Sequence, residues 1–366
     1  MDRRLFLGAG LAAPVVGLSA LDLCAGEAIA TGSTGEVRLR SAENPAGPPK
    51  SAMEAARKEI ASAHRYPRKR VTELREKIAG INGLTADHVI IGAGSIELMI
   101  NTGLWYGRQG RAVLTGDPTW STTAKYAEAS GGEWLRVPLT HDYHYDFDRM
   151  RSAMSDRVDL VYLCHPNNPT GIAEDHDTLL AYVEEVAKTR VVMVDEAFID
   201  CLEGAEELSM KKLLPANKNV VIARTFSKLW GMAGFRVGYM MGDPTLLAQL
   251  ESTVPTLEMQ SSIAAAAAIA AIDDHEYIAA GRRNMRAAQK TIYRILDSHQ
   301  LNYIRTDTNF LSFQVGEPAE AFVDRMRARG VALKPVVVNQ GENWVRVSTG
   351  SSTELAEFER AMGEVV

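Results

Sequence analysis

Residues 223–239 read Ala-Arg-Thr-Phe-Ser-Lys-Leu-Trp-Gly-Met-Ala-Gly-Phe-Arg-Val-Gly-Tyr. The apolar run at residues 220–223 predicts a buried strand. Four polar residues follow this strand at once: Arg224, Thr225, Ser227 and Lys228. Small residues then fill a turn, Arg236 follows, and a second strand begins. A polar turn at the end of a buried strand is typical of ligand sites in open α/β sheets.

The residues of this turn suit one particular chemistry. Lys228 supplies an amine that can form an imine with a phosphorylated aldehyde. The hydroxyls of Thr225 and Ser227 and the guanidinium of Arg236 are suitable phosphate ligands. Taken alone, the stretch also fits an ordinary surface lysine after a strand. The motifs upstream distinguish this interpretation from that of an imine-forming lysine.

Composition is that of a globular enzyme. The chain has 366 residues, 46% hydrophobic and 23% charged, which suits one large and one smaller domain. The formal net charge of −6 argues against nucleic acid as a partner. Three cysteines without zinc-site spacing predict neither a disulfide framework nor a metal centre.

Residues 1–30 are predicted to be an export signal outside the fold. Arg3 and Arg4 precede an apolar run, and Ala28-Ile29-Ala30 offers small residues to a signal peptidase. Paired arginines indicate the twin-arginine route to a bacterial periplasm, with no stable membrane span after signal removal. An anchor helix is the alternative, and the protein is cytoplasmic if the signal is not used.

Strands and helices alternate along the chain, which predicts a largely parallel sheet covered on both faces. The expected strands before the opening stretch are 89–91, 112–115, 134–138, 158–164 and 191–194. The expected helices are 51–63, one whose apolar face carries Val71, Leu74 and Ile78, one that follows the glycine turn at 92–97, 125–130, 175–188 and a long one at 277–299. A C-terminal αβ unit follows, with strands at 310–315, 331–334 and 344–347 and helices at 318–329 and 353–364.

Polar clusters stand where the predicted strands end. They are Gly92-Ala93-Gly94-Ser95, Pro118-Thr119-Trp120, Asn167-Asn168-Pro169 and Asp195-Glu196-Ala197. A glycine turn that opens a helix presents backbone N–H groups to a phosphate. We therefore expect one site, assembled from several loops, with a phosphate held between this turn and the opening stretch.

The ordered motifs resemble those of fold-type I pyridoxal-phosphate (PLP) aminotransferases, and most closely the histidinol-phosphate aminotransferase branch. The motifs are Glu43-Asn44-Pro45, Arg65-Tyr66-Pro67, Gly94-Ser95-Ile96-Glu97, Pro118-Thr119-Trp120, Asn168-Pro169-Thr170-Gly171, Asp195-Glu196-Ala197, Ser227-Lys228 and Arg236. The resemblance covers residue 36 to the end. It implies an α/β fold with a mostly parallel seven-stranded sheet. The expected parts are an N-terminal arm (31–65), a large PLP-binding domain (66–272) and a small C-terminal αβ domain (273–366).

The resemblance implies a role for each site residue. Lys228 carries the cofactor and moves the proton at the substrate Cα, and Asp195 keeps the pyridine nitrogen protonated. Asn168 bonds the ring oxygen O3′, and Trp120 stacks on the ring. The implied phosphate ligands are Ser95, Ile96, Thr225, Ser227, Arg236 and the partner subunit's Tyr66, so a homodimer is implied. The implied substrate ligands are Asn44, Lys334 and Arg346.

The chain departs from the branch's pattern in four places. Phe198 stands where a tyrosine commonly donates to O3′, and Ile96 replaces an aspartate. Lys334 replaces a second substrate-binding arginine, and a lysine cannot form a bidentate clamp. The predicted export signal occupies the segment in which the branch places a substrate-facing tyrosine.

These departures bear on the substrate and leave the cofactor chemistry intact. We expect ping-pong transamination between an ordinary α-amino acid and a 2-oxo acid, ahead of histidinol phosphate as substrate. A decarboxylase of the threonine-phosphate decarboxylase type is the lyase alternative.

Overall fold

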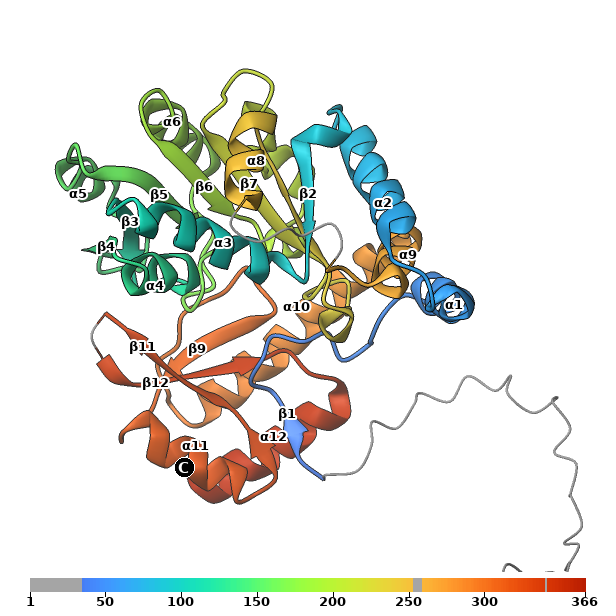
Figure 1. Cartoon of the computed structure of the whole chain (residues 1–366). Coiled ribbons are helices and arrows are strands. Elements are labelled where there is room, and N and C mark those ends of the chain that lie inside the picture. The colour runs from blue at the N-terminus through green and yellow to red at the C-terminus, as the bar shows by residue number, and fades with distance from the viewer. Residues whose placement is uncertain (1–34, 253–258, 340) are drawn as a thin grey trace, which may run out of the picture. The chain divides into compact units, whose positions relative to one another are not determined.

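The computed structural model describes residues 35–252, 259–339 and 341–366. The predicted export signal lies outside these residues. Glu36–Val366 form one compact unit that contains a larger and a smaller domain (Figure 1). None of the helices in the described part of the chain has both the length and the apolar character needed to cross a membrane.

A seven-stranded sheet is the centre of the larger domain (Figure 1). Its order is β2-β8-β7-β6-β5-β3-β4, and β8 alone runs against the other strands. The strands are β2 (Val89–Gly92), β3 (Ala112–Asp117), β4 (Glu133–Pro138), β5 (Val158–Cys164), β6 (Val191–Asp195), β7 (Val220–Thr225) and β8 (Gly238–Met241). The mostly parallel sheet predicted from the sequence is confirmed.

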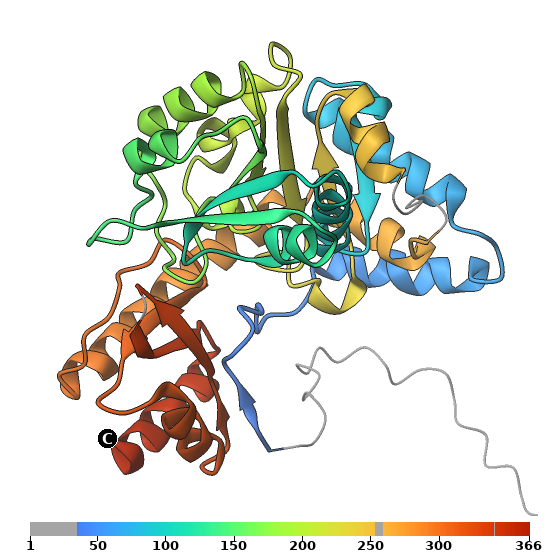
Figure 2. The same ribbon diagram turned by 60° about the vertical axis from the view of Figure 1, so that its left-hand side comes forward.

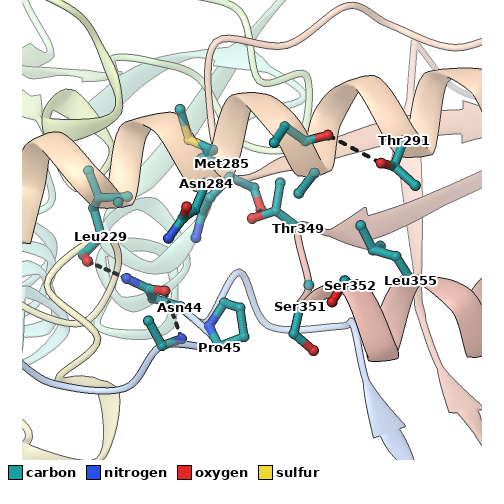
Figure 3. A pocket seen from close by; sticks show the side chains of 16 residues that line it. Asn44, Pro45, Leu229, Asn284, Met285, Thr291, Thr349, Ser351, Ser352 and Leu355 are labelled. Atoms are coloured by element: carbon teal, nitrogen blue, oxygen red, sulfur yellow. Dashed lines mark hydrogen bonds between the residues drawn. The ribbon is translucent and has the colours of Figure 1, made fainter.

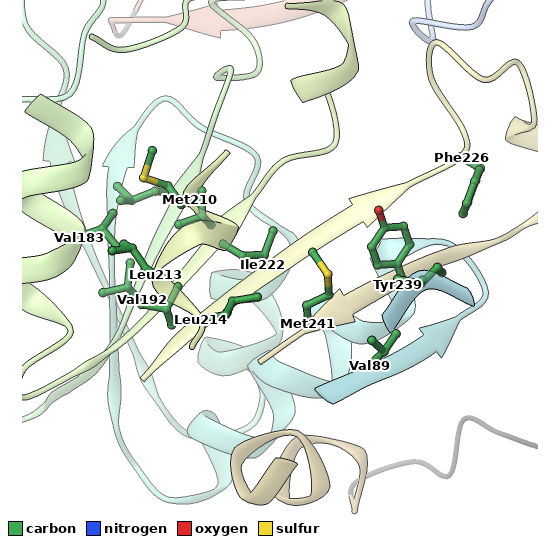
Figure 4. Close-up of a cluster of buried hydrophobic side chains, with 14 of the residues drawn as sticks. Val89, Val183, Val192, Met210, Leu213, Leu214, Ile222, Phe226, Tyr239 and Met241 are labelled. Atoms are coloured by element: carbon green, nitrogen blue, oxygen red, sulfur yellow. The ribbon is translucent and has the colours of Figure 1, made fainter. Parts of the chain in front are cut away.

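Each face of this sheet has its own hydrophobic core, because successive side chains of a strand point to opposite faces. In β5, Val161 and Leu163 belong to one core, and Leu160 and Tyr162 belong to the other. The first core is shared with α2 (Arg68–Ile81), α5 (Phe147–Ser152), α6 (His176–Val186) and α9 (Ser262–Ala271). The second is shared with α3 (Ser95–Arg108), α4 (Thr122–Ala129) and α8 (Pro244–Glu251). Figure 4 shows part of the first core around Ile222.

The long helix α10 (His275–Ser298) joins the two domains (Figure 2). Its Ile278 packs in the large-domain core, and its Ile292 and Ile295 pack in the small-domain core. The small domain has the antiparallel sheet β11-β12-β9. Its elements are β9 (Phe310–Gln314), β11 (Lys334–Val338), β12 (Gly341–Ser348), α11 (Ala319–Arg327) and α12 (Ser352–Val365).

The N-terminal arm contacts both domains. Its strand β1 (Val37–Arg38) pairs in parallel with β10 (Val331–Ala332) of the small domain. The helix α1 (Lys50–Glu59) packs on α9 of the large domain. The chain between them therefore passes the junction where the two domains meet.

Some elements differ from the sequence expectation. The strand expected at 331–334 divides at Leu333, because β10 pairs with the arm while β11 pairs with β12. The short helices α5 and α8 were not predicted, although an aspartate caps the N-terminus of each. Asp146 accepts a hydrogen bond from the Arg149 N–H, and Asp243 accepts one from the Thr245 N–H.

Candidate active site

Loops at one edge of the large sheet converge on a cavity of about 310 Å³. The cavity lies at the carboxyl ends of the parallel strands, where open α/β sheets bind ligands. Most of the residues predicted from the sequence line it: Ser95, Ile96, Trp120, Asn168, Asp195, Thr225, Ser227, Lys228, Arg236, Lys334 and Arg346. The last two come from β11 and β12, so both domains contribute to the site.

Lys228 follows β7 and points into this cavity. Its Nζ donates a hydrogen bond to the Ser41 carbonyl at 3.2 Å and lies 5.3 Å from the centre of the Phe198 ring. Burial is the main cause that lowers the pKa of Lys228 to about 8, and the positive charge of Arg346 adds to it. A lowered pKa increases the share of neutral amine, the form that acts as nucleophile and base.

Asp195 ends β6 and is 2% exposed. Its Oδ2 accepts a hydrogen bond from the Tyr162 hydroxyl at 2.7 Å, and its Oδ1 accepts one from the Ala197 N–H at 3.1 Å. Burial nevertheless raises the pKa of Asp195 to about 6. A carboxylate with these two donors can accept further hydrogen bonds, and a cationic ring N–H in the cavity would stabilise its charged form.

The predicted phosphate ligands form a cradle at the N-terminus of α3. Gly94 has φ 76°, a conformation that favours glycine, and a Cβ at this position would have to displace the Arg236 guanidinium, 2.4 Å away. Arg236 donates to the Ser227 hydroxyl at 3.3 Å, and the Thr225 hydroxyl donates to Ser227 at 2.9 Å. A guanidinium, hydroxyls and a helix N-terminus together suit a phosphate.

Arg346 lies on the small-domain wall and is 4% exposed. Its Nη1 donates to the Asn168 Oδ1 and its Nη2 to the Arg40 carbonyl, each at 2.8 Å. Its buried Nε has no hydrogen-bond partner in the described part of the chain, and burial lowers the pKa of Arg346 to about 10. A buried guanidinium with an unpaired N–H suits an anionic ligand.

Lys334 lies opposite Arg346 in the pairing of β11 with β12. Its Nζ is 5.6 Å from the centre of the Trp120 ring. Burial makes the largest contribution to lowering the pKa of Lys334 to about 8. The neighbouring positive charges of Arg346 and Arg40 lower it further. Positive charge therefore accumulates on this wall of the cavity.

Two predicted residues lie outside this cavity. Asn44 donates to the Leu229 carbonyl at 2.7 Å and to the Tyr277 hydroxyl at 3.0 Å, and it lines a separate cavity of about 410 Å³ beside α10 (Figure 3). Asn44 fastens the arm to the loop after Lys228 and does not line the cavity of Lys228, so its role at the substrate stays a prediction. Tyr66 is 88% exposed, and its role across a subunit interface stays a prediction.

Two polar residues at the site were not predicted from the sequence. Tyr162 lies two positions before the end of β5 among aliphatic residues, where a buried tyrosine hydroxyl is a signal that a partner must be near. Arg40 lies in the irregular arm and lines the cavity beside Lys334 and Arg346. No periodic pattern marks its position.

The residues present fit PLP. The Asn168 Oδ1 is occupied by Arg346, which leaves its Nδ2 to donate to a ring oxygen. The glycine cradle would hold the phosphate, Asp195 would hold a proton on the ring nitrogen, and Lys228 would supply the nucleophile. PLP, when bound, supplies an electron sink for the electron pair at the substrate Cα. Lys228 lies in the same cavity and would be the base that moves the proton at this carbon.

Fold and site define a PLP-dependent enzyme of fold type I. The family model "Aminotransferase class I and II" matches residues 34–364. The chain therefore belongs to the class I and II aminotransferases and is a PLP-dependent aminotransferase, as the sequence predicted.

Relatives and solved structures agree with this family. The chain is 34% identical to histidinol-phosphate aminotransferase of Symbiobacterium thermophilum, over 89% of each chain. It is 31% identical to the enzyme of that name from Methanothermobacter thermautotrophicus, over 90% of this chain and 89% of the relative. It resembles the structure of histidinol-phosphate aminotransferase from Sinorhizobium meliloti in complex with PLP, with TM-score 0.80, 27% identity and 90% of each chain covered.

Proposed function

We propose that this enzyme transfers the amino group of an α-amino acid to a 2-oxo acid, with Arg346 as the ligand of the substrate carboxylate. The observation that carries this proposal is the buried Arg346 guanidinium, which shares the cavity with Lys228 and Asp195. Its unpaired Nε–H and the planar shape of the group suit a carboxylate.

The charges on the cavity wall support a substrate with a second acidic group. Arg40, Lys334 and Arg346 all line the cavity, and no described carboxylate forms an ion pair with any of them. Glu43 also lines the cavity, but it pairs with Arg38 at 3.0 Å. One substrate carboxylate leaves two of the three positive charges unbalanced. Dicarboxylic amino acids and 2-oxo acids are therefore the favoured substrates.

Histidinol phosphate is the second candidate, because the compared relatives bear its name and a phosphate also suits the positive wall. The test is kcat/KM for histidinol phosphate, dicarboxylic amino acids and neutral amino acids, compared as transition-state free energies. We expect dicarboxylic amino acids to rank first. A clear preference for histidinol phosphate would overturn this order, and CO₂ release without amino transfer would favour the decarboxylase.

We also propose a homodimer in which the partner subunit's Tyr66 completes the phosphate cradle. Ile60, Tyr66 and Met259 are 57%, 88% and 62% exposed, and Tyr66 shares a surface pocket with residues 260–263. Exposed apolar and aromatic side chains that gather on one surface favour a protein partner there. Tyr66→Ala and Lys228→Ala subunits, mixed after partial denaturation, are expected to regain activity, since the mixed dimer contains one complete site. No regain would contradict sharing of the site.

Export through the twin-arginine route is proposed from Arg3 and Arg4. Replacement of both by lysine is expected to retain active enzyme in the cytoplasm. Finding the unchanged protein at full length in the cytoplasm of its host would contradict export.

A further inference from the structure

Tyr162 is a buried residue with a polar contact that the proposed function does not use. It lies in β5 with 0% exposure, and its hydroxyl donates to the Asp195 Oδ2 at 2.7 Å. The pairing of β5 with β6 places Cys164 beside Asp195. Tyr162 is two residues earlier and therefore on the same face of the sheet.

The direction of this hydrogen bond is fixed by its surroundings. Burial, followed by the charge of Asp195, raises the pKa of Tyr162 well above its ordinary value, so the phenol stays protonated. A protonated phenol next to a carboxylate must donate. A charge-assisted bond of this length is among the stronger contacts in a protein interior.

Asp195 depends on such donors to remain charged. Three titratable groups face it: Tyr162 and Cys164 from β5, and Lys228 from the loop after β7. Burial raises the pKa of Asp195, while the Tyr162 hydroxyl, the Ala197 N–H and the charge of Lys228 oppose that rise.

We propose that Tyr162 is a positioning residue for the cofactor, whose hydroxyl keeps the Asp195 carboxylate ionised and oriented to accept the N–H of the pyridine ring. Tyr162 does not touch the ring in this role. It acts through Asp195, and its effect is confined to ligands that carry a ring N–H. This inference is independent of the choice of substrate.

The test compares Tyr162→Phe with Tyr182→Phe in the full-length protein. Tyr182 is a matched control, because it is also 0% exposed and its hydroxyl has no partner among the described residues. Each variant is freed of cofactor and titrated with PLP and with the deaza analogue of PLP, in which C–H replaces the ring nitrogen. A packing defect weakens both ligands equally, whereas a defect in Asp195 weakens PLP alone.

We expect Tyr162→Phe to weaken PLP binding by about tenfold for each unit by which loss of the hydroxyl raises the pKa of Asp195 above the assay pH. Binding of the deaza analogue is expected to stay within about threefold, and Tyr182→Phe to leave both ligands unchanged. Equal weakening of the two ligands by Tyr162→Phe, or no weakening of PLP, would overturn the proposal.

A double-mutant cycle gives an independent second measurement. With Asp195 replaced by asparagine, the added Tyr162→Phe substitution is expected to change PLP affinity by less than about threefold, because the charge it supports is gone. Additive losses in the Asp195→Asn, Tyr162→Phe double variant would show that Tyr162 acts by another route.

Discussion

Replacing Arg346 by lysine should weaken amino acid substrates selectively. In the native site the guanidinium bonds Asn168 and the Arg40 carbonyl while its Nε–H stays unpaired. Lysine keeps a positive charge on this wall but lacks the planar fork, so it cannot bond these groups and a carboxylate at once. The substitution therefore separates charge from geometry.

The structure sets the size of the expected effect. At least one charge-assisted hydrogen bond to the substrate carboxylate is lost, which costs about 1.5–3 kcal/mol. This corresponds to a fall of about 10- to 150-fold in kcat/KM for an amino acid. The Asn168 Oδ1 also loses its donor, but Asn168 makes only one of the cofactor's contacts. We therefore expect PLP affinity to fall less than kcat/KM.

The assay follows the absorbance change of the cofactor during the half-reaction with an amino acid and with the amine that lacks its carboxylate. We expect Arg346→Lys to lower kcat/KM for the amino acid and to leave the value for the amine nearly unchanged. Arg294→Lys is the control, because this exposed arginine of α10 pairs with Glu359 far from the cavity lining. Equal decreases in kcat/KM for the amino acid and for the amine would refute carboxylate binding by Arg346. They would show that Arg346 acts through Asn168.

Three further predictions concern the titrating groups. Lys228→Ala should abolish turnover while the cradle and Asp195 still bind PLP, and borohydride should fix the cofactor to Lys228 in the native enzyme; a label on another lysine contradicts the assignment. In the cofactor-free protein, the pKa of Lys228 is lowered from 10.5 to about 8, so the unfolded chain binds more protons within this window and the free energy of unfolding should rise with pH across it. Urea denaturation should show a smaller rise in Lys228→Met. The pKa of Asp195 is raised from 3.8 to about 6, so stability should fall as pH rises between these values, and Asp195→Asn should remove that fall.

The sheet and the cofactor ligands were predictable because both leave local signals. Strands buried on both faces appear as apolar runs, and the polar residues that bind ligands follow directly at their ends, as Asp195 and Lys228 do. Parallel strands bring these ends to the same edge. The prediction of a mostly parallel sheet was therefore sufficient to place most of the predicted site residues around one cavity.

The remaining residues depend on contacts that no local pattern encodes. The bond from Tyr162 to Asp195 requires the register of two neighbouring strands. Arg40 reaches the site through a backbone contact with Arg346, which is 306 positions away in the chain. Asn44 lies close to the site, but its side chain is oriented by hydrogen bonds to the Leu229 carbonyl and the Tyr277 hydroxyl.

The hydrogen bond between Arg346 and Asn168 links the two halves of the site. Arg346, in the small domain, is the proposed substrate ligand, and Asn168, in the large domain, is the predicted cofactor ligand. By occupying the Asn168 Oδ1, Arg346 fixes which end of the amide faces the ring, because only the Nδ2 can donate. Substrate recognition and cofactor binding are therefore coupled through a single amide. It follows that substitutions of Arg346 and Asn168 should not be additive, since either one alone breaks the same contact.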